Sequence, residues 1–306
     1  MNSNPRRSCP RRKLPLLAAI AFVAVLPAFL AARQSLQRDL FVSIVDKAGA
    51  PVATAVPSDL VIREDGQIRE ILAMRKATEP IDVAVLMDTS AAAVSQFVDL
   101  RQGVESFIAG MKGHAQISLV EFGERPRVLA GFTTSATALA EGMGLVFGRT
   151  RAGAYTIEAV LETVGGLQQR NAERKAIIVV WLGGTEFSSS SAQEAIEKLT
   201  ACGASLNVIT VTAGTPADND TLEGRQREML FDRGTDLTGG SRQNIVTSMG
   251  IKPALNRVTR DLLGQYRVTY ARPDRLIPPE KITVASANRA LTVRGTPSII
   301  QAPGRR

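Results

Sequence analysis

Two oxygen-bearing side chains follow a strongly apolar segment. Asp88 and Ser90 come directly after Ile81–Met87 (IDVAVLM), separated from each other by one residue. A carboxylate and a hydroxyl at this spacing suit two kinds of chemistry. They can supply oxygen ligands to a hard divalent cation such as Mg²⁺, or they can cap free backbone N–H groups of a turn that leads into a helix. The two residues alone leave both interpretations open.

The sequence lacks the residue types that most hydrolytic sites need. His114 is the single histidine of the chain, and the serine run Ser188–Ser191 has no G-x-S-x-G pattern around it. The glycine pairs Gly183-Gly184 and Gly239-Gly240 do not have the spacing of phosphate-binding or dinucleotide-binding loops. We therefore expect a protein that is not an enzyme.

Cysteine chemistry is equally limited. Cys9 lies in the basic segment at the start of the chain, so Cys202 stands alone in the rest of it. A lone thiol forms no intramolecular disulfide, and one cysteine with one histidine falls short of a four-ligand zinc site. We expect Cys202 to be a buried thiol of the core.

The segments around Asp88 and Ser90 alternate in type. Apolar, β-branched segments predict buried strands at Ile81–Met87, Gln116–Phe122, Lys175–Leu182 and Ser205–Val211. Amphipathic segments predict helices at Val94–Met111, Thr156–Gln169, Ala192–Ala201 and Ile251–Leu263. This alternation predicts an α/β fold with a doubly wound, mostly parallel sheet, in which ligands bind at the carboxyl ends of the strands. The expected contact face is formed by the loops after Met87, Phe122, Gly153 and Leu182.

Strand-like segments also stand at both ends of the chain. The early ones are Leu40–Val45, Leu60–Arg63 and Gln67–Ala73, and the late ones are Gln265–Ala271, Lys281–Ala285 and Leu291–Arg294. The early group is too small to bury its own faces, so we expect the late strands to complete it. The predicted domains are a small β-sandwich of residues 37–78 and 265–296, an α/β domain of residues 79–264, and a flexible tail at 297–306.

Residues 1–33 have the layout of a targeting segment. Five basic residues precede the uncharged segment Leu14–Ala32, which predicts a signal peptide or an N-terminal membrane anchor. From this we expect an exported protein, periplasmic, secreted or tethered to the membrane through residues 14–32. Without those five residues about +3 of the formal charge of +8 remains, scattered among acidic residues, so we expect no nucleic-acid partner.

Ile81–Ser90 (IDVAVLMDTS) resembles the opening of a von Willebrand factor type A (VWA) domain. Three further segments are similar, in the same order, to parts of a VWFA-related family common in acidobacteria. They are Val45–Val52 (VDKAGAPV), Leu60–Gly66 (LVIREDG) and Gln265–Tyr270 (QYRVTY). The resemblance covers about residues 39 to 296 and implies a VWA/Rossmann-like fold with a β-sandwich.

The VWA resemblance also implies a metal-ion-dependent adhesion site with ligands from three loops. Asp88 and Ser90 match the first two ligand positions, but the remaining positions carry Ala92, Ala154 and Gly183. None of these three has a side-chain oxygen. Because Mg²⁺ loses its hydration water reluctantly, one Asp and one Ser do not hold it. We expect a degenerate site with no metal and no other cofactor.

Thr156 and Glu186 are the nearest substitutes for the lost ligands. We expect Thr156 to be the N-cap of a helix and Glu186 to face solvent from its loop. Asp88, Ser90, Thr156 and Glu186 are our candidate binding residues on the vestigial metal-site loops.

The function that the resemblance implies is an exported adhesion module that binds a protein or cell-surface partner without a metal. One alternative is a structural component of an envelope assembly without a dissociable ligand. The other is residual Mg²⁺-dependent adhesion through Asp88 and Ser90. An exposed apolar patch on the strand-end loops would favour the binding module, whereas a polar strand-end face with an apolar sandwich edge would favour assembly.

Overall fold

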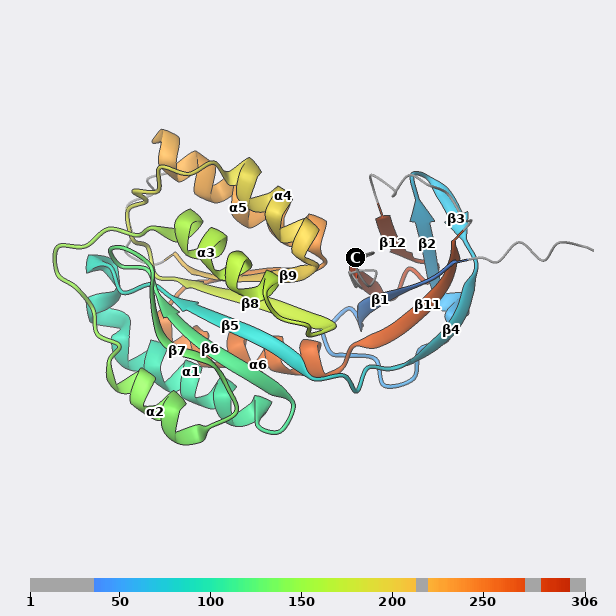
Figure 1. Cartoon of the computed structure of the whole chain (residues 1–306), viewed down its shortest axis with the longest axis horizontal. Helices are drawn as coiled ribbons and strands as arrows, with labels where there is room; N and C mark the ends of the chain where they lie inside the picture. Colours follow the sequence, from blue (N-terminus) through green and yellow to red (C-terminus); the bar gives the residue numbers. More distant parts are fainter. Residues whose placement is uncertain (1–35, 213–219, 273–281, 298–306) are drawn as a thin grey trace, which may run out of the picture. The chain divides into compact units, whose positions relative to one another are not determined.

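The computed structural model describes residues 36–212, 220–272 and 282–297. A six-stranded sheet with helices on both faces is accompanied by two smaller antiparallel sheets (Figure 1). The predicted α/β fold with a mostly parallel sheet, and with extra strands from both ends of the chain, is confirmed.

The large sheet has the strand order β10-β9-β8-β5-β6-β7. All neighbours in it run parallel except β6 and β7, which are antiparallel. Its strands are β5 (Ile81–Met87), β6 (Ala115–Glu121), β7 (Arg127–Thr133), β8 (Arg174–Trp181), β9 (Ala204–Val211) and β10 (Ser241–Ile245). The four strands predicted from apolar segments occupy the centre of this sheet.

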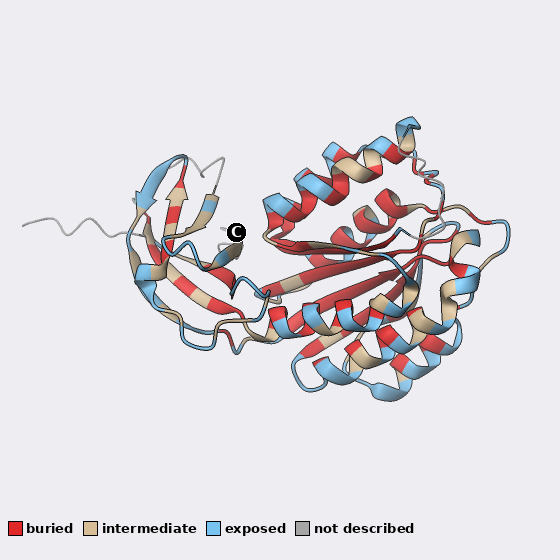
Figure 2. Ribbon diagram, turned by 180° about the vertical axis from the view of Figure 1, so that it is seen from behind, coloured by how far each residue is buried: buried red, intermediate tan, exposed pale blue. Residues whose placement is uncertain are grey.

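The central strand β5 is buried along its whole length because helices cover both faces of the sheet (Figure 2). Val83 and Val85 belong to one apolar core, and Ala84 and Leu86 to the other. This is the period of two expected for successive side chains of a strand. The first face packs against α1 (Phe97–Met111), α2 (Ala136–Gly144) and α6 (Ile251–Leu263), and the second against α3 (Thr156–Gln168), α4 (Ala192–Cys202) and α5 (Leu222–Thr238).

The register of the central strands brings their carboxyl ends to one level. Met87, the last residue of β5, is the partner of Glu121 in β6 and of Val180 in β8. The loops that follow these three strands therefore begin side by side, which is what positions the candidate site. Cys202, at the end of α4, is buried as expected, and burial raises the pKa of its thiol.

The two antiparallel sheets join segments from both ends of the chain. One has the order β13-β1-β11-β4 and the other β12-β2-β3. Their strands are β1 (Leu36–Val45), β2 (Leu60–Glu64), β3 (Gln67–Arg69), β4 (Ile71–Lys76), β11 (Tyr266–Arg272), β12 (Ile282–Ser286) and β13 (Thr292–Pro297). Their shared core includes Leu40, Ile62 and Tyr270. A short 3-10 helix, η1 (Pro57–Asp59), precedes β2.

One predicted strand is in fact two. The segment Gln67–Ala73 divides at Glu70, so that β3 pairs with β2 and β4 pairs with β11 in the other sheet. A change of sheet gives the two pieces different neighbours, which an uninterrupted strand-like pattern in the sequence does not reveal. Of the flexible tail predicted at residues 297–306, Pro297 is the last residue of β13, and residues 298–306 lie outside the described residues.

The location predicted from the sequence needs correction. Within residues 36–212, 220–272 and 282–297, no helix is both long and apolar enough to cross a membrane. Residues 14–32, on which the predicted anchor depended, lie outside the described residues. Export and membrane tethering are therefore withdrawn as conclusions.

Candidate functional site

Main-chain hydrogen bonds join the loops at the carboxyl ends of β5 and β8 to the segment that precedes α3. Ala91 N donates to Ala152 O at 2.9 Å, and Ala154 N donates to Thr185 O at 2.7 Å. Phe187 N donates back to Ala154 O at 2.8 Å. These bonds hold together three loops that are far apart in the sequence.

The carboxylate of Asp88 is fully buried and fully engaged by backbone N–H groups. Its Oδ1 accepts from Ser90 N at 2.9 Å, and its Oδ2 accepts from Leu182 N at 2.9 Å and Gly184 N at 3.2 Å. Both oxygens of the carboxylate thus have hydrogen-bond donors from the backbone. Asp88 therefore serves as the hydrogen-bond acceptor that fixes the loop after β8 to the loop after β5.

Ser90 lies where the three loops meet. Its side chain is fully buried, and its Oγ has no hydrogen-bond partner among the described residues. A Cβ atom added to Gly184 would lie 2.4 Å from Ser90 Oγ and 3.0 Å from the Cβ of Ala154. The space beside Ser90 is therefore closed by a glycine and an alanine, neither of which offers an oxygen ligand from its side chain.

Gly183 has a backbone conformation that excludes the ordinary side chains. Its φ of 99° lies in the region that only glycine adopts readily. An aspartate here would be strained, so the loop after β8 is built for glycine. Position 183, where the VWA resemblance implies an aspartate, thus has a backbone conformation that is unfavourable for one.

Glu186 is buried, so the expectation that it faces solvent is wrong. Its Oε1 accepts from the backbone N–H of Thr156 at 2.9 Å and also from the hydroxyl of Ser188. Ser188 Oγ in turn accepts from the backbone N–H of Ile157 at 3.0 Å. Glu186 and Ser188 together cap the start of α3 from the neighbouring loop. Burial raises the pKa of the Glu186 carboxyl.

Thr156 is not the N-cap of α3, contrary to expectation. It is the first residue of the helix, and the cap position belongs to Tyr155, which makes no side-chain capping bond. Because Glu186 and Ser188 already satisfy the first two helical N–H groups, α3 does not need a cap from its own segment. Ser188 is the functional neighbour that the sequence reasoning missed, since it stood within a serine run expected to be an ordinary loop.

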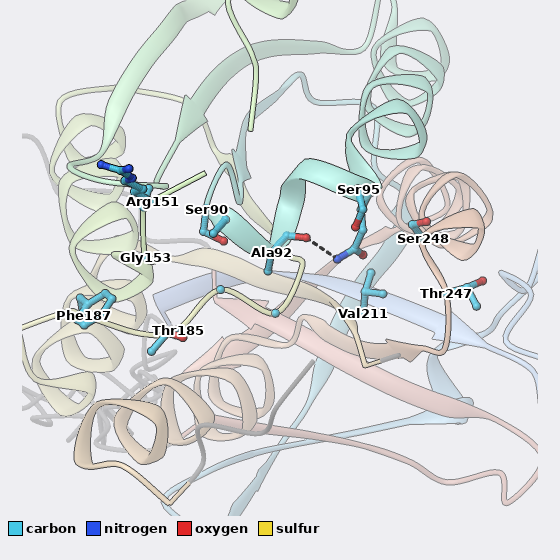
Figure 3. Close-up of a pocket in the computed structure, with 15 residues that line it drawn as sticks. Ser90, Ala92, Ser95, Arg151, Gly153, Thr185, Phe187, Val211, Thr247 and Ser248 are labelled. Carbon is cyan, nitrogen blue, oxygen red and sulfur yellow. Dashed lines mark hydrogen bonds between the residues drawn. The ribbon is translucent and has the colours of Figure 1, made fainter. Parts of the chain in front are cut away.

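A cavity of about 640 Å³ opens over this group of loops (Figure 3). The 3-10 helix η2 (Ala91–Gln96) forms one wall, and Gln96 Nε2 donates to Ala92 O at 2.9 Å within it. The other walls carry Arg151 and Phe187, together with Thr247 and Ser248 next to the 3-10 helix η3 (Ser248–Gly250). Arg151 is the one charged residue among the lining residues that the structure describes.

The comparisons with known proteins agree with this architecture. Residues 83–185 match the sequence profile of the von Willebrand factor type A domain. The central region of this chain is VWA-like in sequence and in fold. No curated protein matches the chain. The match concerns the VWA domain, and the narrower resemblance to a VWFA-related family common in acidobacteria stays a prediction.

Two solved structures share the fold. A von Willebrand factor type A protein from Catenulispora acidiphila is 11% identical over 87% of this chain and 74% of its own, with a TM-score of 0.50. Proximal thread matrix protein 1 from the mussel byssus is 11% identical over 66% of this chain and 49% of its own, also with a TM-score of 0.50. At this identity the likeness shows the fold alone.

The side chains of this VWA domain do not fit the divalent ion that the family implies. Asp88 has both oxygens engaged, and the positions of Ala92, Ala154 and Gly183 lack oxygen-bearing side chains. In the part of the chain that the structure describes, no group of three or more His, Cys, Asp or Glu residues is arranged to hold a metal. Ser90 Oγ and Thr156 Oγ1 are buried oxygens without a hydrogen-bond partner among the described residues. Two hydroxyl groups are too few ligands for Mg²⁺.

Proposed function

We propose that this protein is a binding module that engages a protein partner through the strand-end face of its VWA domain, without a metal ion. The observation that carries the proposal is that both oxygens of Asp88 accept hydrogen bonds from backbone N–H groups, three in all. The residue that would begin a metal site is instead a structural link between two loops. A partner must then be recognised by the surface itself.

The strand-end face has the exposed apolar side chains that such recognition needs. Phe187 is 55% exposed on the cavity wall, and Met249 is 77% exposed in the helix that lines the opposite wall. Phe147 and Val246, in the loops nearby, are also exposed. Exposed apolar groups above a polar cavity are typical of surfaces that bind proteins. The face is not uniformly polar, which favours the binding module over a purely structural role.

Hydroxyl groups and one arginine supply the polar part of this face. Ser95, Thr185, Thr247 and Ser248 line the cavity with Arg151. Hydroxyls can donate and accept hydrogen bonds, so they suit main-chain and side-chain groups of a peptide segment. No catalytic step is assigned to these residues, and the proposed role is binding alone. The division into a VWA domain of residues 79–264 and a sandwich of residues 37–78 and 265–296 is part of the same proposal.

Site-specific photo-crosslinking tests the proposed face. A photoreactive amino acid placed at position 187 or 249 should give a discrete crosslinked adduct in an extract of the source cells, with or without chelator. The same amino acid at position 128, where Val128 is 62% exposed on the edge strand β7, is the matched control and should give none. Adducts that disappear with chelator would refute the metal-free mechanism. Adducts that are equal at all three positions would refute the strand-end face.

A further inference from the structure

A second cavity, of about 310 Å³, lies at the amino ends of the strands, away from the strand-end face. Residues 77–80 line it ahead of β5, and Gly113 and His114 line it ahead of β6. Arg174, the first residue of β8, and Leu263, the last of α6, complete the lining. Its volume suits a ligand of few non-hydrogen atoms.

Arg174 in the wall of this cavity is a buried cation without a carboxylate partner. It is 4% exposed. Its Nη1 donates to Glu79 O at 2.9 Å, and its Nη2 donates to Gln265 Oε1 at 2.8 Å and to Leu262 O. All three acceptors are neutral, and within the described ranges no carboxylate forms a salt bridge with it. Burying a charge is costly unless an opposite charge compensates it.

One nitrogen of the same guanidinium has no acceptor. Nε of Arg174 is buried and makes no hydrogen bond with any described residue. The bonds from Nη1 and Nη2 hold the guanidinium near the carboxyl end of α6, where a cation is favourable because of the helix dipole. They do not provide an acceptor for Nε. Burial lowers the pKa of Arg174 to about 10, so the side chain stays charged at neutral pH.

Glu79, the one carboxylate among the described lining residues, is paired with two other arginines. Glu79 accepts hydrogen bonds from Arg267 Nη1 at 2.6 Å and from Arg75. Although its partial burial acts to raise the pKa of Glu79, the hydrogen bonds from Arg267 and Arg75 lower it to about 2. Its negative charge is therefore shared with two other arginines and compensates that of Arg174 only in part.

We propose that this cavity binds a small oxyanion, with Arg174 as the buried cation and the imidazole of His114 as a donor at its exposed rim. The ligand chemistry is that of a carboxylate or a phosphate group. The anion would lie against the Arg174 side chain in the cavity wall and add negative charge to the partial compensation from Glu79. This site is independent of the proposed binding face.

His114 provides a direct test because it is the only histidine in the chain. In the untagged full-length protein, the Cε1–H proton of its imidazole gives a single assignable NMR signal. Titration with sodium phosphate or sodium acetate at constant pH should move this signal saturably. Sodium chloride at the same ionic strength should leave it in place. The oxyanion that saturates at the lower concentration identifies the source of the ligand chemistry.

Variants of Arg174 connect the signal to the proposed cation. Arg174→Met keeps the aliphatic volume and removes the charge, and it should weaken binding at least about tenfold. Arg151→Met removes an arginine at the other end of the sheet and should leave the titration unchanged. If Arg174→Met does not fold, Arg174→Lys retains the charge without the guanidinium geometry and should weaken binding several-fold. The proposal is overturned by a signal that does not move, that moves equally with chloride, or that saturates equally in the folded Arg174 variant.

Discussion

The carboxylate of Asp88 links two loops of the strand-end face by hydrogen bonds. Its two oxygens accept hydrogen bonds from the backbone N–H groups of Ser90, Leu182 and Gly184, which belong to two loops. The sequence left two interpretations of Asp88 open, a metal ligand and a backbone cap. The contacts favour the second, and they extend the cap across loops that are 94 residues apart in the case of Leu182.

Removing this carboxylate should destabilise the fold whether or not a cation is present. Asp88→Ala leaves three buried N–H groups without an acceptor and should cost about 3 kcal/mol. Asp88→Asn keeps one acceptor oxygen and should cost less, about 1 to 2 kcal/mol. Urea unfolding of both variants, with and without Mg²⁺, measures this. A change below about 0.5 kcal/mol for Asp88→Ala would contradict the structural role.

Helix α3 depends on residues outside its own segment for its first hydrogen bonds. Ser188 Oγ accepts from Ile157 N, so Ser188→Ala should cost about 1 kcal/mol, the usual value for a lost cap. Ser189 is the matched control, because it is exposed and its Oγ makes only a 3.3 Å contact with Glu158. Ser189→Ala should change the free energy of unfolding much less. Equal effects in the two variants would refute the capping role of Ser188.

The other capping residue, Glu186, should make the stability depend on pH. Burial raises its pKa above the ordinary value of 4.5. The folded protein then binds this proton more tightly than the unfolded chain, so the stabilisation is complete below 4.5 and is lost as the pH rises through the raised pKa. Relative to Glu186→Gln, the wild type should lose stability as the pH rises above the ordinary value of 4.5, measured by urea unfolding at a series of pH values. A constant difference across that range would show that burial of Glu186 does not perturb its titration.

The central strands could be predicted from the sequence, whereas α5 and the caps of α3 could not. Strands β5 and β8 are buried on both faces, and their apolar runs show this directly. The buried side of α5 carries small and polar residues, among them Gly234 and Thr235, so it has little apolar periodicity. Its fully buried Arg227 lies 4.2 Å from the centroid of the Trp181 ring, an interaction that a hydrophobic pattern does not indicate.

Glu186 illustrates why the site was harder to predict than the fold. Its burial results from the approach of the start of α3, whose residue Thr156 lies 30 positions earlier in the chain. A glutamate in a glycine-rich loop looks solvent-exposed when only its neighbours in sequence are considered. The positions without ligand oxygens, such as Ala92, were visible from residue type alone. The sequence did not reveal that Glu186 and Ser188 accept hydrogen bonds from the start of α3, or that Asp88 accepts them from the loop after β8.

At the scale of the whole chain, early and late strands form two antiparallel sheets with a shared core. Strand β1 pairs with β11 and β13, so residues near the start depend on strands from the last part of the chain for their hydrogen bonds. The predicted pairing of early and late strands depended on the early strands being too few to bury their faces. The strand-end face of the α/β domain is the surface that we propose for a partner.

The central claim is that this face works without a metal ion, and thermal unfolding of the full-length protein tests it most directly. We predict the same melting temperature in excess Mg²⁺, in excess Mn²⁺ and with chelator. A specific ion present at 100 times its dissociation constant would stabilise the fold by about 2.7 kcal/mol. A cation-dependent rise of that size in the wild type, absent in Asp88→Ala, would contradict the account and restore ion-mediated binding.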